Sequence, residues 1–356
     1  MSEFDASASR SAPIAFACPA PLPPGDQVLL GHGSGGRLSA DLVRSLFHPA
    51  FGDPELARLG DAAVVDVEGT RLAFTTDGFV VQPAFFPGSD IGALAVNGTV
   101  NDLAVMGARP AFLSAAFILE EGFPTDDLGR IAESMGAACT TAGIRLVAAD
   151  TKVVERGGAD GIFIVTSGIG TLPEGVHLGP EHIEDGDVVI VSGPVGDHGV
   201  AVMSRRAGID FEVDVGSDTA PLTELVDVMR TAGSVHCLRD ATRGGVATVL
   251  NELAASAGVT ITIDDEAVPV QDPVRAACET LGIDPLYVAN EGVCVAMVGS
   301  DSSDAVVAAA REHPIGRQAV AIGRVESGPA AVHLRTGLGV TRPLLMLTAD
   351  QLPRIC

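Results

Sequence analysis

The segment Asp90–Gly107, with the sequence DIGALAVNGTVNDLAVMG, has the apolar spacing of a helix. It nevertheless carries Asn97, Asn101 and Asp102 in its interior. Asparagine and aspartate have low helix propensity, and burying them without partners costs free energy. Because three such residues stand on an otherwise apolar background, we interpret them as functional residues rather than as a solvated face of the helix.

Strands and helices alternate on both sides of this helix, a pattern typical of an α/β (α+β) protein. Before it, apolar patterns predict strands at 62–67 and 72–76. After it, they predict a strand at 111–119, a helix at 126–142, a buried strand at 144–149 and a strand at 161–170. The second half continues with strands at 188–192, 259–263, 293–298, 319–325 and 331–334, and with helices at 200–207, 221–231, 245–257, 272–281 and 303–312.

Proline, glycine and acidic residues between 173 and 187 mark a boundary between two domains. We expect an N-terminal domain at 28–172 and a C-terminal α/β domain at 173–345. The arm at 1–27 is rich in Ala, Ser and Pro, has no apolar period and is predicted to be disordered. The end of the chain, 346–356, is predicted to be a mobile tail, because Pro353 resists helix and sheet.

The charge of the chain argues against contact with nucleic acids or anionic membranes, because 46 Asp and Glu outnumber 22 Lys and Arg and give a net charge of -24. Hydrophobic residues make up 47% of the sequence and tryptophan is absent, which favours an aliphatic core over a base-stacking surface. No apolar run has membrane-spanning length, and the six cysteines lack CxxC spacing. We therefore expect a reduced, cytoplasmic protein that binds neither nucleic acid nor membrane.

A glycine-rich loop, Gly31-His32-Gly33-Ser34-Gly35-Gly36, precedes a predicted helix at 38–47. Its glycine spacing is that of a P-loop, but Arg37 and Leu38 stand where that motif needs lysine and serine or threonine. A P-loop NTPase is therefore disfavoured, and both a flexible flap over phosphates and a plain turn stay open for this loop.

Carboxylates gather at the predicted ends of strands and inside the helix at 90–107. Asp61 opens the strand at 62–67, Asp77 closes the strand at 72–76, and Asp240 and Glu291 precede a helix and a strand in the second half. Together with Asp102, these are more acids than turns alone require. Several carboxylates without His or Cys suit a hard cation such as Mg²⁺, which commonly bridges protein oxygens to ATP phosphates. The set predicts phosphoryl transfer by a fold other than that of P-loop enzymes.

Two further segments carry groups that suit an anion. In Asp150-Thr151-Lys152, an acid and a base flank a hydroxyl after the strand at 144–149, which indicates either a ligand-facing edge or a surface ion pair. Backbone amides at the start of the helix at 245–257, with Arg243 beside them, form a natural anion site. His198, on a glycine-rich turn, is interpreted as structural.

The chain ends in Pro353-Arg354-Ile355-Cys356, which leaves a thiol on the last residue. A cysteine with no downstream backbone can reach other sites, although a frayed terminus that happens to end in cysteine is an equal alternative. A prenylation signal is disfavoured, since it needs the cysteine four residues from the end.

In their order along the chain, these motifs resemble the HypE family of hydrogenase maturation proteins, within the superfamily of aminoimidazole ribonucleotide synthetases and selenophosphate synthetases. The superfamily shares the glycine flap and the aspartates, whereas the Pro-Arg-Ile-Cys ending belongs to the HypE family. The resemblance runs from Leu30 to Cys356 and is carried by the segments 75–77, 85–88, 97–103, 150–154, 196–199, 239–245, 290–292 and 352–356. It implies a two-domain PurM-like fold in which the N-terminal sheets of two subunits form a barrel-like dimer, with ATP at the cleft.

The resemblance also implies an activity. A carbamoyltransferase, HypF, loads a carbamoyl group onto the terminal thiol, here Cys356, and the protein uses ATP to dehydrate this thiocarboxamide to a thiocyanate. The cyano group then passes to iron on a HypC–HypD scaffold and becomes a cyanide ligand of the [NiFe] hydrogenase centre.

The residues implied for this reaction form three groups. The Mg²⁺ ligands would be Asp61, Asp77, Asp102 and Asp240. The catalytic residues would be Cys356, Lys152, Glu291 and Asp102, with either of the last two as the base. ATP would contact Gly33, Gly35, Gly36, Thr76, Asn101, Thr151, Arg243 and Gly244.

Two other functions stay open at this point. A selenophosphate synthetase would also use Mg-ATP, but it normally places a reactive cysteine near the N-terminal glycine loop, and Cys18 lies in the proline-rich arm without that context. A non-catalytic nucleotide-sensing scaffold could use the acidic surface to dock partners. Replacing Cys356 and weighing the protein after reaction with ATP discriminate among the three.

Overall fold

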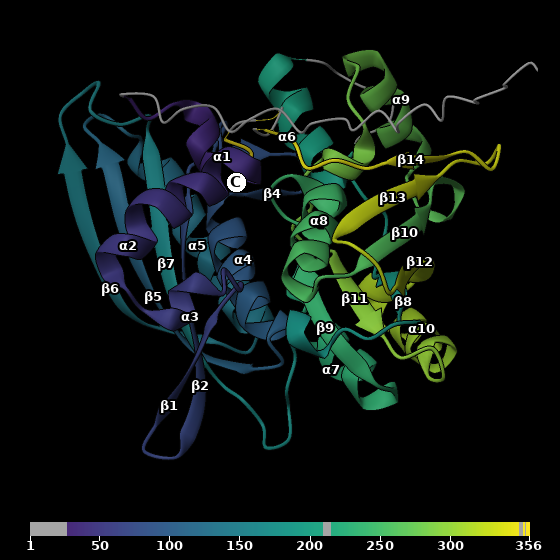
Figure 1. Ribbon diagram of the computed structural model, residues 1–356. Helices are drawn as coiled ribbons and strands as arrows, with labels where there is room; N and C mark the ends of the chain where they lie inside the picture. The colour runs from purple at the N-terminus through teal and green to yellow at the C-terminus, as the bar shows by residue number, and fades with distance from the viewer. Residues whose placement is uncertain (1–26, 209–214, 349–351, 353) are drawn as a thin grey trace, which may run out of the picture.

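The computed structural model describes residues 27–208, 215–348, 352 and 354–356. The predicted arm, except Gln27, and residues 349–351 and 353 of the predicted tail lie outside this part of the chain. Two sheets lie side by side, one from each half of the chain (Figure 1). The predicted α/β fold class is confirmed.

The N-terminal half opens with short helical segments and continues with a sheet and two long helices. The opening segments are η1 (Leu30–Gly33), α1 (Gly36–Leu42), η2 (Val43–Phe47), α2 (His48–Phe51) and α3 (Pro54–Ala57). They are followed by β1 (Ala63–Val67), β2 (Thr70–Phe79), β3 (Phe85–Phe86), β4 (Ser89–Asp90), α4 (Ile91–Val105), β5 (Arg109–Glu120), α5 (Thr125–Thr141), β6 (Arg145–Val154) and β7 (Ile162–Thr171).

The C-terminal half forms the larger sheet, with helices packed against it. Its elements are η3 (Pro180–His182), β8 (Val188–Val191), α6 (Asp197–Ala207), α7 (Thr223–Ala232), β9 (Val235–Asp240), α8 (Gly245–Ala257), β10 (Thr260–Asp264), η4 (Asp265–Ala267), α9 (Asp272–Leu281), η5 (Pro285–Tyr287), β11 (Cys294–Val298), α10 (Ser303–Glu312), η6 (Pro314–Gly316), β12 (Val320–Glu326), β13 (Ala331–Arg335) and β14 (Thr341–Pro343). The bounds of α8, α9 and α10 are those that the sequence predicts, whereas β9 and β14 are missed.

The two large sheets are mixed, and β3 and β4 form a separate antiparallel pair. The N-terminal sheet has the order β1-β2-β7-β5-β6, and the C-terminal sheet has the order β14-β13-β10-β12-β8-β11-β9. All pairings are antiparallel except β5 with β6 and β10 with β13. Within the described residues of one chain the N-terminal sheet is open, so the barrel implied by the resemblance would need a second copy.

Two sequence predictions about strands are wrong. β2 runs on to Phe79, so Asp77 lies within the strand instead of closing it. β6 extends to Val154 and contains Asp150 to Lys152, and it is exposed along nine of its ten residues although it is predicted to be buried. Its apolar residues suggested burial, but the strand lies at an edge of the sheet.

Helix α4 joins the two halves. Nearly every residue of α4 is buried, and the helix packs against β2, β7 and α5 on one side and against β9 and α7 of the other half. The Asn101 amide donates to the carbonyls of Ala220 and Glu291 at 3.0 Å each, and its oxygen accepts from the Leu222 amide at 2.8 Å. These three bonds satisfy a polar group that is 1% exposed and tie α4 to the C-terminal half.

The end of the chain lies between the halves, beside α1 (Figure 1). Leu352 and Ile355 are buried in the same apolar cluster as Phe86 of β3 and Val200 of α6. Burial of each such side chain contributes roughly 1.5–3 kcal/mol. The tail is predicted to be mobile, yet the part of its end that the structure describes is docked. Among the described residues, no helix is long and apolar enough to cross a membrane.

Candidate active site

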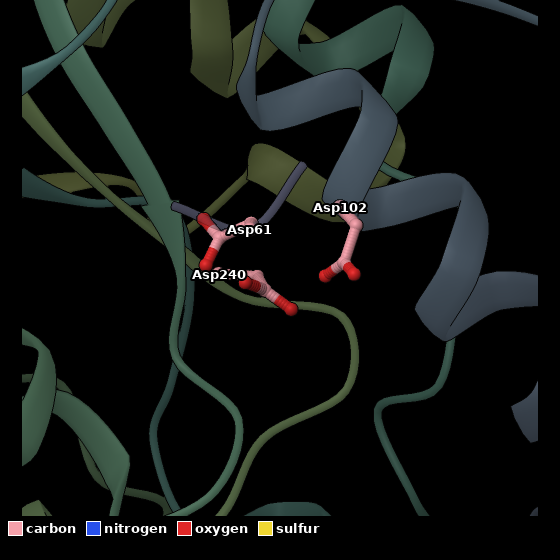
Figure 2. Close-up of side chains that lie close together, drawn as sticks. All are labelled: Asp61, Asp102 and Asp240. Atoms are coloured by element: carbon pink, nitrogen blue, oxygen red, sulfur yellow. The ribbon is translucent and has the colours of Figure 1, made fainter. Parts of the chain in front are cut away.

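Three carboxylates from distant parts of the chain meet between the halves (Figure 2). Asp61 lies two residues before β1, Asp102 lies on α4, and Asp240 is the last residue of β9. One carboxylate oxygen of each lies within 4.8 Å of the others. An all-oxygen donor set of this kind suits a hard divalent cation.

Burial and neighbouring carboxylates raise the proton affinity of all three acids. Burial raises the pKa of Asp61 to about 6, although the Arg239 guanidinium, with its Nε 2.8 Å from the Asp61 oxygen, acts against this rise. Burial, and then the charges of neighbouring acids, hold the pKa of Asp102 and of Asp240 well above the usual range. A bound cation would relieve this repulsion, so the residues fit Mg²⁺ chemically.

We expect the metal-free protein to lose stability as pH rises. Because the folded-state pKa of each acid is raised, the folded state binds more protons, and its extra stability is complete below the unfolded pKa of 3.8 and is lost as pH rises through about 6 for Asp61. In the presence of a chelator, the melting temperature of the protein should fall by a few degrees between about pH 5 and about pH 8. Addition of Mg²⁺ should restore it at the higher pH.

Thermal denaturation across pH, with EDTA or Mg²⁺, measures this. The Asp240→Asn variant should lose most of the stabilisation by Mg²⁺, whereas Asp126→Asn, at an exposed position on α5, should keep it. Equal stabilisation by Mg²⁺ in both variants would contradict the assignment.

Asp77 and Thr75, both on β2, lie beside the three-acid cluster. The Thr75 hydroxyl lies 2.7 Å from Asp102 Oδ2 and 2.8 Å from the Asp61 backbone oxygen. Burial raises the pKa of Asp77, and a hydrogen bond with the Asp102 side chain opposes the rise. That bond requires a proton on one of the two carboxyls in the absence of a cation. Asp77 therefore lies next to the three-acid cluster and contacts it through Asp102.

Glu291 lies on the loop before β11 and is 3% exposed. Burial, followed by the charges of Asp240, Asp218 and Asp77, holds its pKa well above the usual range. Gly98 of α4 lies beside this side chain and makes room for the Phe79 ring, since a Cβ there would lie 2.8 Å from that ring.

A cavity of about 450 Å³ contains these acids and the end of the chain. The glycine loop forms one wall, where the Arg243 Nη1 donates to the Gly33 carbonyl at 3.1 Å. A Cβ at Gly36, which has a φ of +73°, would lie 2.8 Å from the Leu347 carbonyl oxygen, so only glycine allows this close approach. The predicted site residues that line the cavity are Gly33, Gly35, Gly36, Asp61, Thr76, Asp77, Asp102, Asp240, Arg243, Glu291 and Cys356.

The end of the tail runs antiparallel to the segment after β2. The Val80 amide donates to a Cys356 backbone oxygen at 3.0 Å, and the Gln82 amide donates to the Arg354 carbonyl at 3.4 Å. Cys356 is partly exposed, and its negative charge is the main cause of the raised pKa of Arg243. Cys356 therefore lies in the acid-lined cavity, as it must if its side chain is to react there.

Four predicted site residues do not line the cavity. Lys152 and Thr151 lie exposed on β6, where Lys152 pairs with Asp150, as in the alternative reading of a surface ion pair. The Asn101 side chain is used in its three hydrogen bonds to the backbone of the C-terminal half, and Gly244 is the N-cap of α8, at a φ of +74°.

Sequence reasoning missed Thr75, Arg239 and His198 as residues of the site or of the tail contact. Thr75 and Arg239 stand in the motifs at 75–77 and 239–245, so their position beside acids was the available signal. His198 offered no signal that it contacts the tail.

Two family models cover most of the chain. The N-terminal domain of AIR synthase related protein matches residues 59–172, and its C-terminal domain matches residues 184–334. The carbamoyl dehydratase HypE of Rhizobium leguminosarum bv. viciae is 51% identical over 330 residues, which are 92% of this chain and 94% of that protein.

Solved structures give the same comparison. The chain is similar to a HypE–HypF complex, with a TM-score of 0.82 and 45% identity over 86% of this chain and 99% of that one. It is also similar to HypE in complex with ATP, with a TM-score of 0.78 and 46% identity over 93% of this chain and 100% of that one.

Proposed function

The chain belongs to the AIR synthase related proteins and, within them, to the carbamoyl dehydratase HypE family, and from that premise we propose that its reaction takes place on its own last residue, Cys356. It is an ATP-dependent carbamoyl dehydratase of hydrogenase maturation. The substrate is a carbamoyl group bound to the Cys356 sulfur, and the product is the thiocyanate. The position of Cys356 in the acid-lined cavity carries this proposal.

The reaction needs ATP because the amide oxygen is a poor leaving group. The carbamoyl oxygen attacks the γ-phosphorus of ATP and ADP leaves, which turns the oxygen into a phosphate ester. The nitrogen loses one of its two protons as this ester forms. A base then takes the second proton from nitrogen, the C–O bond breaks, and inorganic phosphate departs with the oxygen. The carbon and nitrogen are left as a nitrile on sulfur, so the protein loses the elements of one water.

Asp61, Asp102 and Asp240 are the residues that would hold Mg²⁺, with Asp77 beside them. When bound, the cation would neutralise the phosphate oxygens of ATP. Arg243, which lies between the glycine loop and the end of the tail, stabilises charge that develops on the transferred phosphoryl group. The loop from Gly31 to Gly36 covers the nucleotide and excludes water.

Glu291 is the base, because Asp102 belongs to the three-acid cluster and Glu291 does not. Burial, and then neighbouring negative charges, raise the proton affinity of Glu291, and Arg243 together with a bound cation would keep it ionised so that it can accept a proton. We expect Glu291→Gln to slow dehydration by about 10²–10⁴-fold without weakening ATP binding.

Asp102→Asn separates the two roles. It should raise the Mg²⁺ concentration needed for half-maximal rate, whereas Glu291→Gln should lower the maximal rate at saturating Mg²⁺. Titration of single-turnover rates with Mg²⁺ measures both. If Glu291→Gln instead raised the Mg²⁺ concentration needed for half-maximal rate, and Asp102→Asn did not, Glu291 would be the metal ligand and Asp102 the base.

Lys152 and Thr151 act in the site of a second subunit of a homodimer. The strand that carries them, β6, is an edge strand exposed on both faces, and its Val147 and Val153 are 54% and 65% exposed. On the same sheet, Phe112 of the adjacent β5, Ile169 of β7 and Phe74 of β2 are also exposed. A long apolar edge of this kind is characteristic of a surface that is covered in the assembled protein.

We expect Val153→Asp to weaken dimerisation by about 10²-fold or more, because it places an unpaired charge in a buried interface. Sedimentation at a series of concentrations measures this. Leu338→Asp is the matched control, since Leu338 is 94% exposed and lies on the turn before β14, at the far edge of the other sheet. Dissociation in both variants, or in neither, would contradict an interface at β6.

The partners follow from the reaction. HypF supplies the carbamoyl group, in keeping with a solved HypE–HypF complex, and a HypC–HypD scaffold receives the cyano group for the iron of the hydrogenase. The tail has to leave the cavity for both exchanges. We place these steps in the cytoplasm.

Intact-mass measurement tests the function. After incubation with HypF and its carbamoyl donor, the protein should gain one carbamoyl group on the C-terminal peptide. Addition of Mg-ATP should then remove the mass of one water. A stable carbamoyl adduct that ATP does not change would refute dehydration on Cys356.

A further inference from the structure

A buried histidine contacts the main chain of the tail. His198 of α6 is 0% exposed, and its Nε2 lies 2.9 Å from the carbonyl oxygen of Ile355. Because a carbonyl only accepts hydrogen bonds, Nε2 carries the proton. Nδ1 then accepts from the Ser217 hydroxyl at 2.8 Å, and the Ser217 oxygen lies 2.5 Å from the Thr219 hydroxyl. This chain of bonds fixes the tautomer that donates to the tail.

The surroundings of His198 keep it neutral. Burial lowers its pKa to about 4, and the ring packs edge-on against Phe86 with centroids 5.4 Å apart. A neutral imidazole has one N–H group, and here that group is used on the Ile355 carbonyl. When the tail leaves, the donor loses this buried acceptor, which favours the docked tail.

A second side chain of α6 binds the preceding peptide. Arg206 donates from Nη2 to the Arg354 carbonyl at 2.6 Å and from Nε to the Gln82 carbonyl at 2.8 Å. The contacts of His198 and Arg206 with the tail are to the carbonyl oxygens of Ile355 and Arg354, so neither depends on what the Cys356 sulfur carries.

We propose that His198 is a positioning residue that holds the Ile355 carbonyl and thereby sets the fraction of time that Cys356 spends in the cavity. The proposal rests on the function proposed above. Because the contact is to the main chain, it acts alike on the free, the carbamoylated and the cyanated tail. The tail can therefore return after loading and leave again after dehydration.

The experiment compares His198→Leu, which removes the donor, with His198→Gln, whose amide nitrogen can replace Nε2. Two rates are measured: iodoacetamide alkylation of Cys356, followed on the C-terminal peptide, and single-turnover water loss from carbamoylated protein. His198→Leu should speed alkylation and slow water loss, each by about 10–100-fold, because a buried carbonyl loses its donor. His198→Gln should restore both rates to within a few fold, and ATP affinity should stay unchanged in both variants.

Controls separate this role from general damage. His333→Leu, on β13 near the far edge of the C-terminal sheet, should leave both rates unchanged. Ser217→Ala removes the hydroxyl that orients the His198 ring. It should change both rates in the same direction but by less, and it takes the place of His198→Leu if that variant does not fold. Unchanged alkylation and water loss in these variants, in a protein whose wild type dehydrates, would overturn the proposal. Altered alkylation in a protein whose wild type never loses water would instead refute the function and leave the tail contact standing.

Discussion

Cys356→Ser is expected to abolish ATP-dependent loss of water from the protein, while ATP binding and melting temperature stay close to those of the wild type. The sulfur is the atom that carries the carbamoyl group, and a serine hydroxyl, which is not ionised near neutral pH, does not replace a thiolate as nucleophile. The side chain is partly exposed at the chain end, so its replacement leaves no buried cavity. Intact-mass measurement after incubation with HypF, carbamoyl donor and Mg-ATP reads the result.

Cys18→Ser is the control, and it also tests the selenophosphate synthetase alternative. The dehydratase should be indifferent to Cys18 and fail without Cys356. An enzyme that phosphorylates selenide should show the reverse. Water loss from Cys356→Ser protein would place the substrate on another residue.

Addition of a single alanine after Cys356 is expected to reduce water loss below detection, although the cysteine itself is unchanged. The Val80 amide binds the terminal residue, and the tail runs antiparallel to residues 80–82. A residue 357 would continue toward Phe79 and Gly78, which line the cavity that the triphosphate has to enter. It would also move the terminal carboxylate away from the position it takes in the docked tail.

Carbamoyl loading separates this effect from a folding defect. In the proposed cycle, loading takes place with the tail outside the cavity, so the extended protein should still accept a carbamoyl group from HypF and then retain it with ATP present. An extension of the N-terminus by one alanine is the matched control and should dehydrate normally. Normal water loss from the C-terminally extended protein would contradict recognition of the chain end.

Local patterns predicted most elements of the fold. The helices at 245–257, 272–281 and 303–312 have clear apolar periods, and the structure has the same bounds. β9 was missed because its sequence, VHCLRD, mixes polar and apolar residues without alternation. The burial of β6 was predicted wrongly, because apolar residues in an edge strand look like those of a central strand until the pairing order is known.

The sequence predicted which types of residue form the candidate site, but not which of them lie together. Strand-end and helix acids indicated a cation, and Asp61, Asp102 and Asp240 do meet. That Asp77 lies beside the cluster instead of within it depends on the course of β2, which continues beyond the predicted end. Lys152 could not be separated from the cavity residues, since the sequence does not show that its strand lies exposed at the edge of the sheet.

Two adjacent residues of α4 make different contacts, one with the three-acid cluster and one with the backbone of Glu291. Asp102 belongs to the cation cluster, and Asn101 holds the backbone of Glu291 at 3.0 Å. The helical turn that carries both residues therefore fixes the distance between the three-acid cluster and Glu291, the proposed base, and the two halves cannot separate here without breaking the Asn101 contact. In the proposed cycle, substrate then has to enter past the glycine loop and the departing C-terminus.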